Sequence, residues 1–176
     1  MGDTILRELV YGKGAHVDPV ACVEDISAEL AARTLAGYPH SIWQIVEHMS
    51  YWMDYDLGRI AGEDRPYPEK AIESWPSRPN PATDGGKDGG KRDEQWRAAT
   101  RRFSDLLARL ARLAECDAGE LGRTVRKLGP AQSSLESTVH AMLWQIAAHN
   151  SYHAGQIALL RRLFGAWPPR RGGDTW

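Results

Sequence analysis

The segment LWQIAAHNSYHAGQIALLRR, residues 143–162, places His149 and His153 four residues apart in a run that is otherwise typical of an apolar helix. Side chains at positions i and i+4 of a helix lie about 5–6 Å apart at Cβ, which is close enough for both imidazoles to bind one metal ion. A buried imidazole needs hydrogen-bond partners or a ligand, because leaving it without either costs stability. The pair is therefore either a hydrogen-bonded core feature or part of a metal site.

A helical projection at 100° per residue separates the three histidines of this segment. The predicted buried stripe consists of Leu135, Val139, Met142, Ile146, Ile157, Leu160 and Phe164. His153 falls at the centre of that stripe and His149 within about 40° of it, whereas His140 falls roughly 140° away. Two of the three imidazoles are thus predicted to point into the protein.

A metal site needs a further ligand from another element, and His48 is the best candidate because it flanks the apolar stripe of its own predicted helix. His16 and His40 fall in irregular segments, where a helical projection does not apply. Cys22 and Cys116 form no C-x-x-C motif and are too few for a disulfide framework. Three histidines that leave one coordination position open are a known arrangement of catalytic zinc.

The metalloprotease motif H-E-x-x-H is excluded, because Asn150 follows His149 where that motif has its glutamate. The remaining interpretations differ in what occupies the open position of the metal. A bound water would supply hydroxide near neutral pH, which is the hydrolase interpretation. A thiolate in its place is the thiol-transferase interpretation.

Four main helical patterns with short extra helical turns are expected to position these residues, so the predicted fold is an all-α four-helix bundle. Short helical segments are predicted at about 3–11, after Asp18, and over 27–33. Ser41 and Gln44 form a capping-box pattern before a helix that closes at Gly62, and Ser133 with Glu136 predicts a second capping box before the last helix. Another helix is predicted from residue 93, residues 116–132 are expected to be irregular, and no strand is predicted.

A long loop rich in proline and glycine is predicted over 63–92, between the second and third main helices. Such a loop is either a lid over one end of the bundle or an exposed insertion without a role. The last helix is expected to stop near Gly165, which leaves a C-terminal tail over 165–176. The whole chain, 1–176, is expected to form a single domain.

Composition and charge restrict the partners. The net charge is −1, with 22 basic and 23 acidic residues, so a nucleic-acid or membrane-surface partner is not expected. No apolar run approaches the roughly 18 residues that span a bilayer. The start of the sequence lacks the pattern of a secretory signal, so a cytoplasmic location is expected.

The sequences HSIWQIVEHMSYW and HNSYHAGQIALLRR together resemble the DinB-like (YfiT-like) superfamily of metal-dependent proteins. The similarity extends to GPAQSSLESTVHAMLWQIAAH and to the tail GAWPPRRGGDTW, with 63–92 as the least similar part. The resemblance implies a bundle in up-down-down-up order that binds one divalent ion, zinc or nickel, through His48, His149 and His153.

The resemblance also implies a small-molecule substrate, with a low-molecular-weight thiol such as bacillithiol or mycothiol as a possible cosubstrate. The expected activity is that of a thiol-dependent S-transferase or isomerase, or of a hydrolase. The alternative is a non-catalytic metal-binding module with a stress-response or interaction role. Many relatives in this superfamily look like homodimers, so the resemblance implies that this chain also forms a homodimer.

Seven residues are candidates for the pocket around the metal. Five polar residues lie on the same sides of the predicted helices as the histidines and could contact a ligand: Gln44, Tyr55, Gln145, Tyr152 and Gln156. The alternative role of these residues is hydrogen bonding between helices. Trp52 is expected to form a pocket wall. Asp56 falls on the apolar stripe of its helix, where it would orient a histidine or pair with an arginine.

Overall fold

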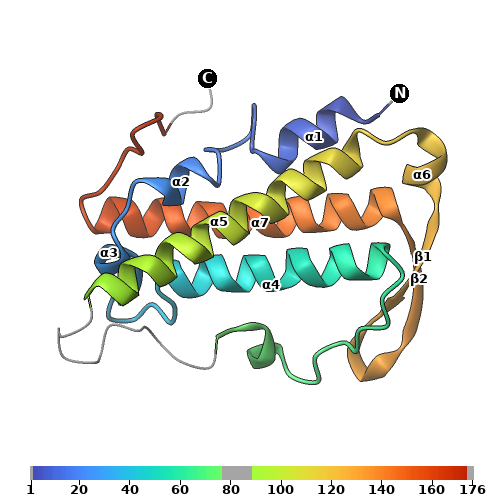
Figure 1. Cartoon of the computed structure of the whole chain (residues 1–176), viewed down its shortest axis with the longest axis horizontal. Coiled ribbons are helices and arrows are strands. Elements are labelled where there is room, and N and C mark those ends of the chain that lie inside the picture. Colours follow the sequence, from blue (N-terminus) through green and yellow to red (C-terminus); the bar gives the residue numbers. More distant parts are fainter. Residues whose placement is uncertain (1, 77–88, 174–176) are drawn as a thin grey trace.

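The computed structural model describes residues 2–76 and 89–173, and this part of the chain is mostly helical (Figure 1). The long helices are α4 (Ile42–Ile60), α5 (Gly89–Ala114) and α7 (Val139–Leu163). The short ones are α1 (Thr4–Val10), α2 (Ala21–Glu24), α3 (Ala28–Ala32), α6 (Ala118–Gly122) and the 3₁₀ turns η1 (Ala71–Ser74) and η3 (Pro130–Gln132). The strands β1 (Thr124–Leu128) and β2 (Ser134–Thr138) complete the described elements.

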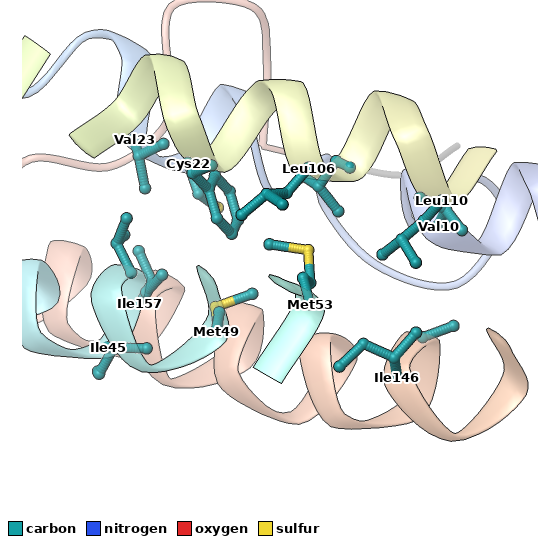
Figure 2. Close-up of a cluster of buried hydrophobic side chains, with 14 of the residues drawn as sticks. Val10, Cys22, Val23, Ile45, Met49, Met53, Leu106, Leu110, Ile146 and Ile157 are labelled. Carbon is teal, nitrogen blue, oxygen red and sulfur yellow. The ribbon is translucent and has the colours of Figure 1, made fainter. Parts of the chain in front are cut away.

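The central packing unit consists of α1, α4, α5 and α7. Helix α4 packs against both α5 and α7, and α1 packs against the same two helices. In Figure 1, α4 and α5 run in one direction, and α1 and α7 run in the other. Side chains from these helices and from α2 meet in the core, among them Met49, Met53, Leu106 and Ile146 (Figure 2).

The helix starts follow local capping chemistry. Carboxylate Oδ1 of Asp3 accepts a hydrogen bond from the backbone N–H of Leu6, and the Ser27 hydroxyl accepts one from Leu30. Ser41 and Gln44 form the predicted capping box, in which each side chain accepts from the backbone of the other residue. Caps of this kind satisfy backbone donors that have no partner within the helix. The predicted starts of α1, α3 and α4 are therefore confirmed.

The predicted start of the last helix is wrong. Residues 134–138 form β2, which pairs antiparallel with β1 in the register Thr124↔Thr138, and α7 begins only at Val139. Thr138 is the N-cap, because its hydroxyl accepts from the backbone N–H of Ala141. Leu135 is consequently exposed on the hairpin instead of lying on the buried stripe. Pairing with β1 gives the backbone of 134–138 hydrogen-bond partners across the hairpin in place of those within a helix.

The predicted loop over 63–92 is partly helical. Helix α5 begins at Gly89, within the predicted loop, and η1 forms a short turn over Ala71–Ser74. The segment before η1 is attached to the end of α4 by Arg59, whose guanidinium donates to the carbonyl of Glu63. Residues 77–88 lie outside the described residues. The structure thus has no helix or strand over 63–70, as predicted, but it has a helical turn over Ala71–Ser74 and a helix from Gly89 onward, where a loop was predicted.

The segment after α7 is anchored by a buried ion pair. Arg161 donates to the Asp25 carboxylate at 2.7 Å and to the carbonyls of Cys22 and Ala166 at 2.8 and 2.9 Å. The backbone N–H of Arg170 donates to the second oxygen of Asp25. These bonds hold α2, the end of α7 and the following segment together.

Among the described residues, no helix combines the length and apolar character that crossing a membrane requires.

Candidate metal centre

Three imidazoles converge between α4 and α7. His48 comes from the middle of α4, and His149 and His153 come from successive turns of α7. One ring nitrogen of each histidine lies within 4.8 Å of the others, and His48 and His153 are buried while His149 is half-buried. The packing of α4 against α7 brings them together, since each lies on the side of its helix that faces the other. The structure thus brings the three predicted ligands together.

An oxygen lies within hydrogen-bonding distance of Nδ1 in all three imidazoles. The Nδ1 atom of His48 is 3.0 Å from the carbonyl of Ser74, and that of His153 is 2.7 Å from Oε1 of Gln156. The Nδ1 atom of His149 lies 3.4 Å from Oδ1 of Asn150. Because the Ser74 carbonyl and Oε1 of Gln156 accept, these two contacts place the proton of His48 and of His153 on Nδ1 and leave each Nε2 with a lone pair. This is the tautomer that metal-binding histidines adopt when a neighbouring oxygen fixes their orientation.

Two of the imidazoles meet through their Nε2 atoms. The Nε2 atoms of His48 and His149 are 3.2 Å apart, a distance at which a proton on His149 Nε2 makes a hydrogen bond, and at which two unprotonated nitrogens repel each other unless a cation lies between them. Two nitrogens bound tetrahedrally to one zinc ion at about 2.0–2.1 Å are about 3.3 Å apart. A divalent cation therefore fits this donor set, and we expect its binding to draw the three rings closer together.

Burial keeps the imidazoles neutral. Burial, together with a smaller effect of the neighbouring imidazoles, lowers the pKa of His48 to about 4 and that of His149 to about 4. Burial also lowers the pKa of His153, against the opposing effect of its bond to Gln156. Since metal ions bind the neutral form of histidine, the ligands are ready to bind at neutral pH without losing a proton first.

The segment after α4 covers the centre. The indole of Trp75 stacks between two imidazoles, with ring centroids 3.6 Å from His40 and 3.8 Å from His48. Its edge also meets His153 at 5.9 Å. Together with the Ser74 carbonyl, this ring fixes the plane of His48 from outside the helix pair. This part of the predicted loop therefore forms one wall of the centre.

A cavity of about 370 Å³ opens beside His149. Trp52 and Asp56 of α4, Gln145 of α7 and Tyr67 line it, and the turn of the hairpin at 128–130 closes another side. The volume lies within the range of about 300–1,000 Å³ that small-molecule sites have. Three of the predicted pocket residues, Trp52, Asp56 and Gln145, thus lie on one cavity that reaches a candidate metal ligand.

The other candidates lie elsewhere. Gln44 takes part in the capping box of α4, and Tyr55 is buried with its hydroxyl donating to the carbonyl of Arg65 at 3.4 Å. Tyr152 is exposed and touches the edge of His153 with its ring. Gln156 does not line the described cavity but orients His153, as noted above.

The remaining histidines and cysteines have other surroundings. His16 bonds to the Ser151 hydroxyl at 2.8 Å, and His140 lies 2.9 Å from the Asp3 carboxylate, on the side of α7 that faces α1. Cys22 is buried, and burial raises the pKa of its thiol to about 12, so it is neither a nucleophile nor a ready ligand. Cys116 is half-buried away from the three imidazoles.

Sequence reasoning missed Ser74, Trp75, His40 and Asn150 as partners of the imidazoles. Ser74 acts through its backbone carbonyl, which any residue supplies, so no sequence signal identifies it. Trp75 and His40 belong to segments without helical periodicity. Asn150 had a signal that the sequence analysis did not use: a projection at 100° per residue places this polar residue about 60° from His153, near the inner face of α7, and the structure buries it.

The fold and the centre together define a mostly helical protein with a tri-histidine site between two antiparallel helices. A model of the DinB superfamily matches residues 19–157, a span that includes all three histidines. The chain belongs to the DinB superfamily. Comparison with curated proteins and with solved structures gave no match.

The Gln156 contact leads to a prediction. We expect Gln156→Leu to weaken zinc binding about tenfold, because removal of a hydrogen-bonding partner of a ligand histidine typically costs 10–100-fold in metal affinity. A competition titration against a chromophoric chelator measures the change. Gln95→Leu, an exposed position on α5, is the matched control and should bind as the wild type does. Equal affinity in both variants would contradict the role of Gln156.

Proposed function

We propose that this protein is a metal-dependent enzyme that binds one divalent ion, zinc or nickel, through His48, His149 and His153. The observation that carries the proposal is the convergence of three neutral imidazoles beside a cavity of small-molecule size.

A further part of the proposal is that α1, α4, α5 and α7 form a four-helix bundle in up-down-down-up order. The directions of these helices in Figure 1 support it.

A divalent ion bound by three histidines has a coordination position left for a substrate atom, and it supplies Lewis acidity there. We propose that the substrate group is the sulfur of a low-molecular-weight thiol, with transfer of that thiol to a second small molecule. The soft thiolate suits zinc or nickel with imidazole ligands. Hydrolysis is the second candidate activity, and the same cavity beside His149 supports it.

Asp56 is proposed to act on substrate in the cavity. Its carboxylate is buried on α4, one turn after Trp52, and both residues line the cavity that reaches His149. A carboxylate in this place is suited to accept a proton from a bound thiol or water, or to orient a polar group of the substrate. The apolar side chains around it hold the rest of a small molecule and exclude water.

The role of Asp56 leads to a prediction on turnover. We expect Asp56→Asn to lower kcat about 100-fold with unchanged metal content, because the amide retains the shape of the carboxylate but does not accept a proton. Steady-state kinetics with the substrate found in the screen below measures kcat, and elemental analysis measures the metal. Unchanged kcat would remove Asp56 from the proton transfer.

The proposal is tested by a screen of the purified protein loaded with zinc or with nickel. Thiol substrates, including bacillithiol and mycothiol, are offered with a panel of electrophiles, and ester and amide substrates are offered separately. We expect thiol consumption that the His153→Ala variant lacks. Consumption of esters or amides alone would favour hydrolysis. No turnover in either panel, with metal bound, would instead support the non-catalytic metal-binding module.

A further inference from the structure

A second cavity, of about 450 Å³, is lined by the end of α4, the end of α5 and the region of α6. These elements meet at the same end of the molecule (Figure 1). The cavity shares no lining residue with the cavity beside His149. Leu57, which lines it, lies nine residues after His48 on α4, so a rotation of about 100° per residue places it on the opposite side of that helix. The second cavity is therefore separate from the metal centre.

One part of this cavity is apolar. Leu57 and Ile60, which lie one turn apart on α4, are buried, and Leu113 of α5 is half-buried. We call these three side chains the apolar floor. The cavity volume lies within the range of about 300–1,000 Å³ that small-molecule sites have. The floor therefore offers a place for the hydrocarbon part of a small ligand.

Three guanidinium groups line the same cavity. Arg109 and Arg112 belong to the last turns of α5, and Arg123 follows α6. The carboxylate that lines the cavity, that of Glu120, accepts from Nε and Nη2 of Arg123 at 2.9 and 2.7 Å. The carbonyl of Ile60 accepts from the same Nη2 at 3.0 Å, which holds Arg123 against the end of α4. The negative charge of the cavity is thus already matched by one of its three arginines.

The other two arginines have no counter-charge. In the part of the chain that the structure describes, neither Arg109 nor Arg112 has a hydrogen-bond or ion-pair partner for its guanidinium. Arg102 on the same helix differs, because it lies 3.7 Å from the carboxylates of Glu47 and Asp54. Residues three apart are neighbours on a helix surface, and like charges there repel each other. The cavity therefore combines two unmatched positive charges with an apolar floor.

We propose that this cavity binds a small amphiphilic anion, with a carboxylate or phosphate monoester head and a hydrocarbon body. The head contacts Arg109 and Arg112, since the planar N–H groups of a guanidinium match the paired oxygens of both anions. The body covers the apolar floor and removes it from water. Inorganic phosphate would leave the floor exposed, and a neutral amphiphile would leave both charges unmatched. Binding of this anion does not depend on the metal centre.

Cys116 is a natural reporter for this cavity. Its thiol is half-buried and lines the cavity, so a bound ligand covers it. The second cysteine of the chain, Cys22, is buried, and burial raises the pKa of its thiol to about 12, so that it reacts slowly with alkylating agents. The rate at which neutral iodoacetamide alkylates Cys116, followed by peptide mass spectrometry, therefore measures how much of the cavity is occupied.

Octanoate and octyl phosphate, below the concentrations at which they form micelles, are the probes. We expect at least one of them to slow the alkylation of Cys116 saturably; protection by one alone identifies the head as carboxylate or phosphate. From the butyl to the octyl member of that series, affinity should rise roughly threefold per methylene. Octan-1-ol should leave the rate unchanged. Equal protection by octan-1-ol, an affinity independent of chain length, or no protection by either anion overturns the proposal.

Arg112→Gln tests the contact with the head group. The side chain is exposed, so its replacement leaves the core of the folded chain intact. Each variant is measured with and without ligand, because loss of a nearby cation also changes the reactivity of the thiol itself. We expect the dissociation constant to rise about tenfold, since hydrogen bonds to charged groups are the strong ones.

Arg97→Gln is the matched control. Arg97 is an exposed arginine of the same helix and does not line this cavity, so the variant should bind as the wild type does. Arg109→Gln should behave as Arg112→Gln does. An unchanged dissociation constant in both cavity variants, or an equal loss of affinity in Arg97→Gln, overturns the proposal.

Discussion

His149→Ala is expected to leave the purified protein without its stoichiometric divalent ion, whereas His140→Ala is expected to retain it. The His149 imidazole supplies one of three converging nitrogens, and its Nε2 lies 3.2 Å from that of His48. Loss of a partner that only orients a ligand costs 10–100-fold in affinity, so loss of the ligand itself should cost more than about 100-fold. Native mass spectrometry with elemental analysis measures the bound metal.

The His140→Ala control distinguishes the centre from a general effect of removing a histidine. Both residues lie on α7, but His140 bonds to Asp3 at 2.9 Å on the side that faces α1. His48→Ala and His153→Ala should behave as His149→Ala does. Equal metal content in the His149 and His140 variants would exclude the proposed ligand set, and the DinB superfamily assignment of the chain would be unaffected.

The three converging histidines were predictable because each lies on a long regular helix. Periodicity alone placed His149 and His153 on the inner side of α7, and the flank of the α4 stripe indicated His48. The same reasoning predicted the start of α4 from Ser41 and Gln44, since capping is a local interaction between residues three apart. Local signals thus account for the helical fold and for the histidine cluster.

The residues that complete the centre depend on contacts between distant parts of the chain. The Ser74 carbonyl reaches His48 across 26 residues, and Trp75 stacks on His40 from a segment without periodicity. The β-hairpin escaped prediction for a related reason. Ser133 and Thr138 are both suitable N-caps, and the choice between them is made by the pairing of 134–138 with 124–128. A projection of one helix contains no information on such pairings.

Asp25→Ala is expected to lower the free energy of unfolding by about 3 kcal/mol, because it leaves the guanidinium of Arg161 buried without its counter-charge. The Arg161 side chain is 2% exposed and that of Asp25 is 12% exposed, and their atoms are 2.7 Å apart. Glu24→Ala is the matched control, since Glu24 pairs with the exposed Arg171 on the surface, where ion pairs contribute about 0–1 kcal/mol. Urea denaturation at pH 7 measures both.

The contribution of Asp25 should also depend on pH. Burial alone would raise the pKa of Asp25, but the hydrogen bonds from Arg161 and from the backbone of Arg170, with the Arg161 charge, hold the pKa below its ordinary value. A carboxyl whose pKa is lower in the folded state contributes stability that is present above the unfolded-state pKa of about 3.9 and is lost as the pH falls through the folded-state value. The difference between the wild type and Asp25→Asn should therefore be largest at neutral pH and should shrink below about pH 4. A difference that grows on acidification would contradict this account, because it would mean that protonated Asp25 stabilises the anchor of the C-terminal segment.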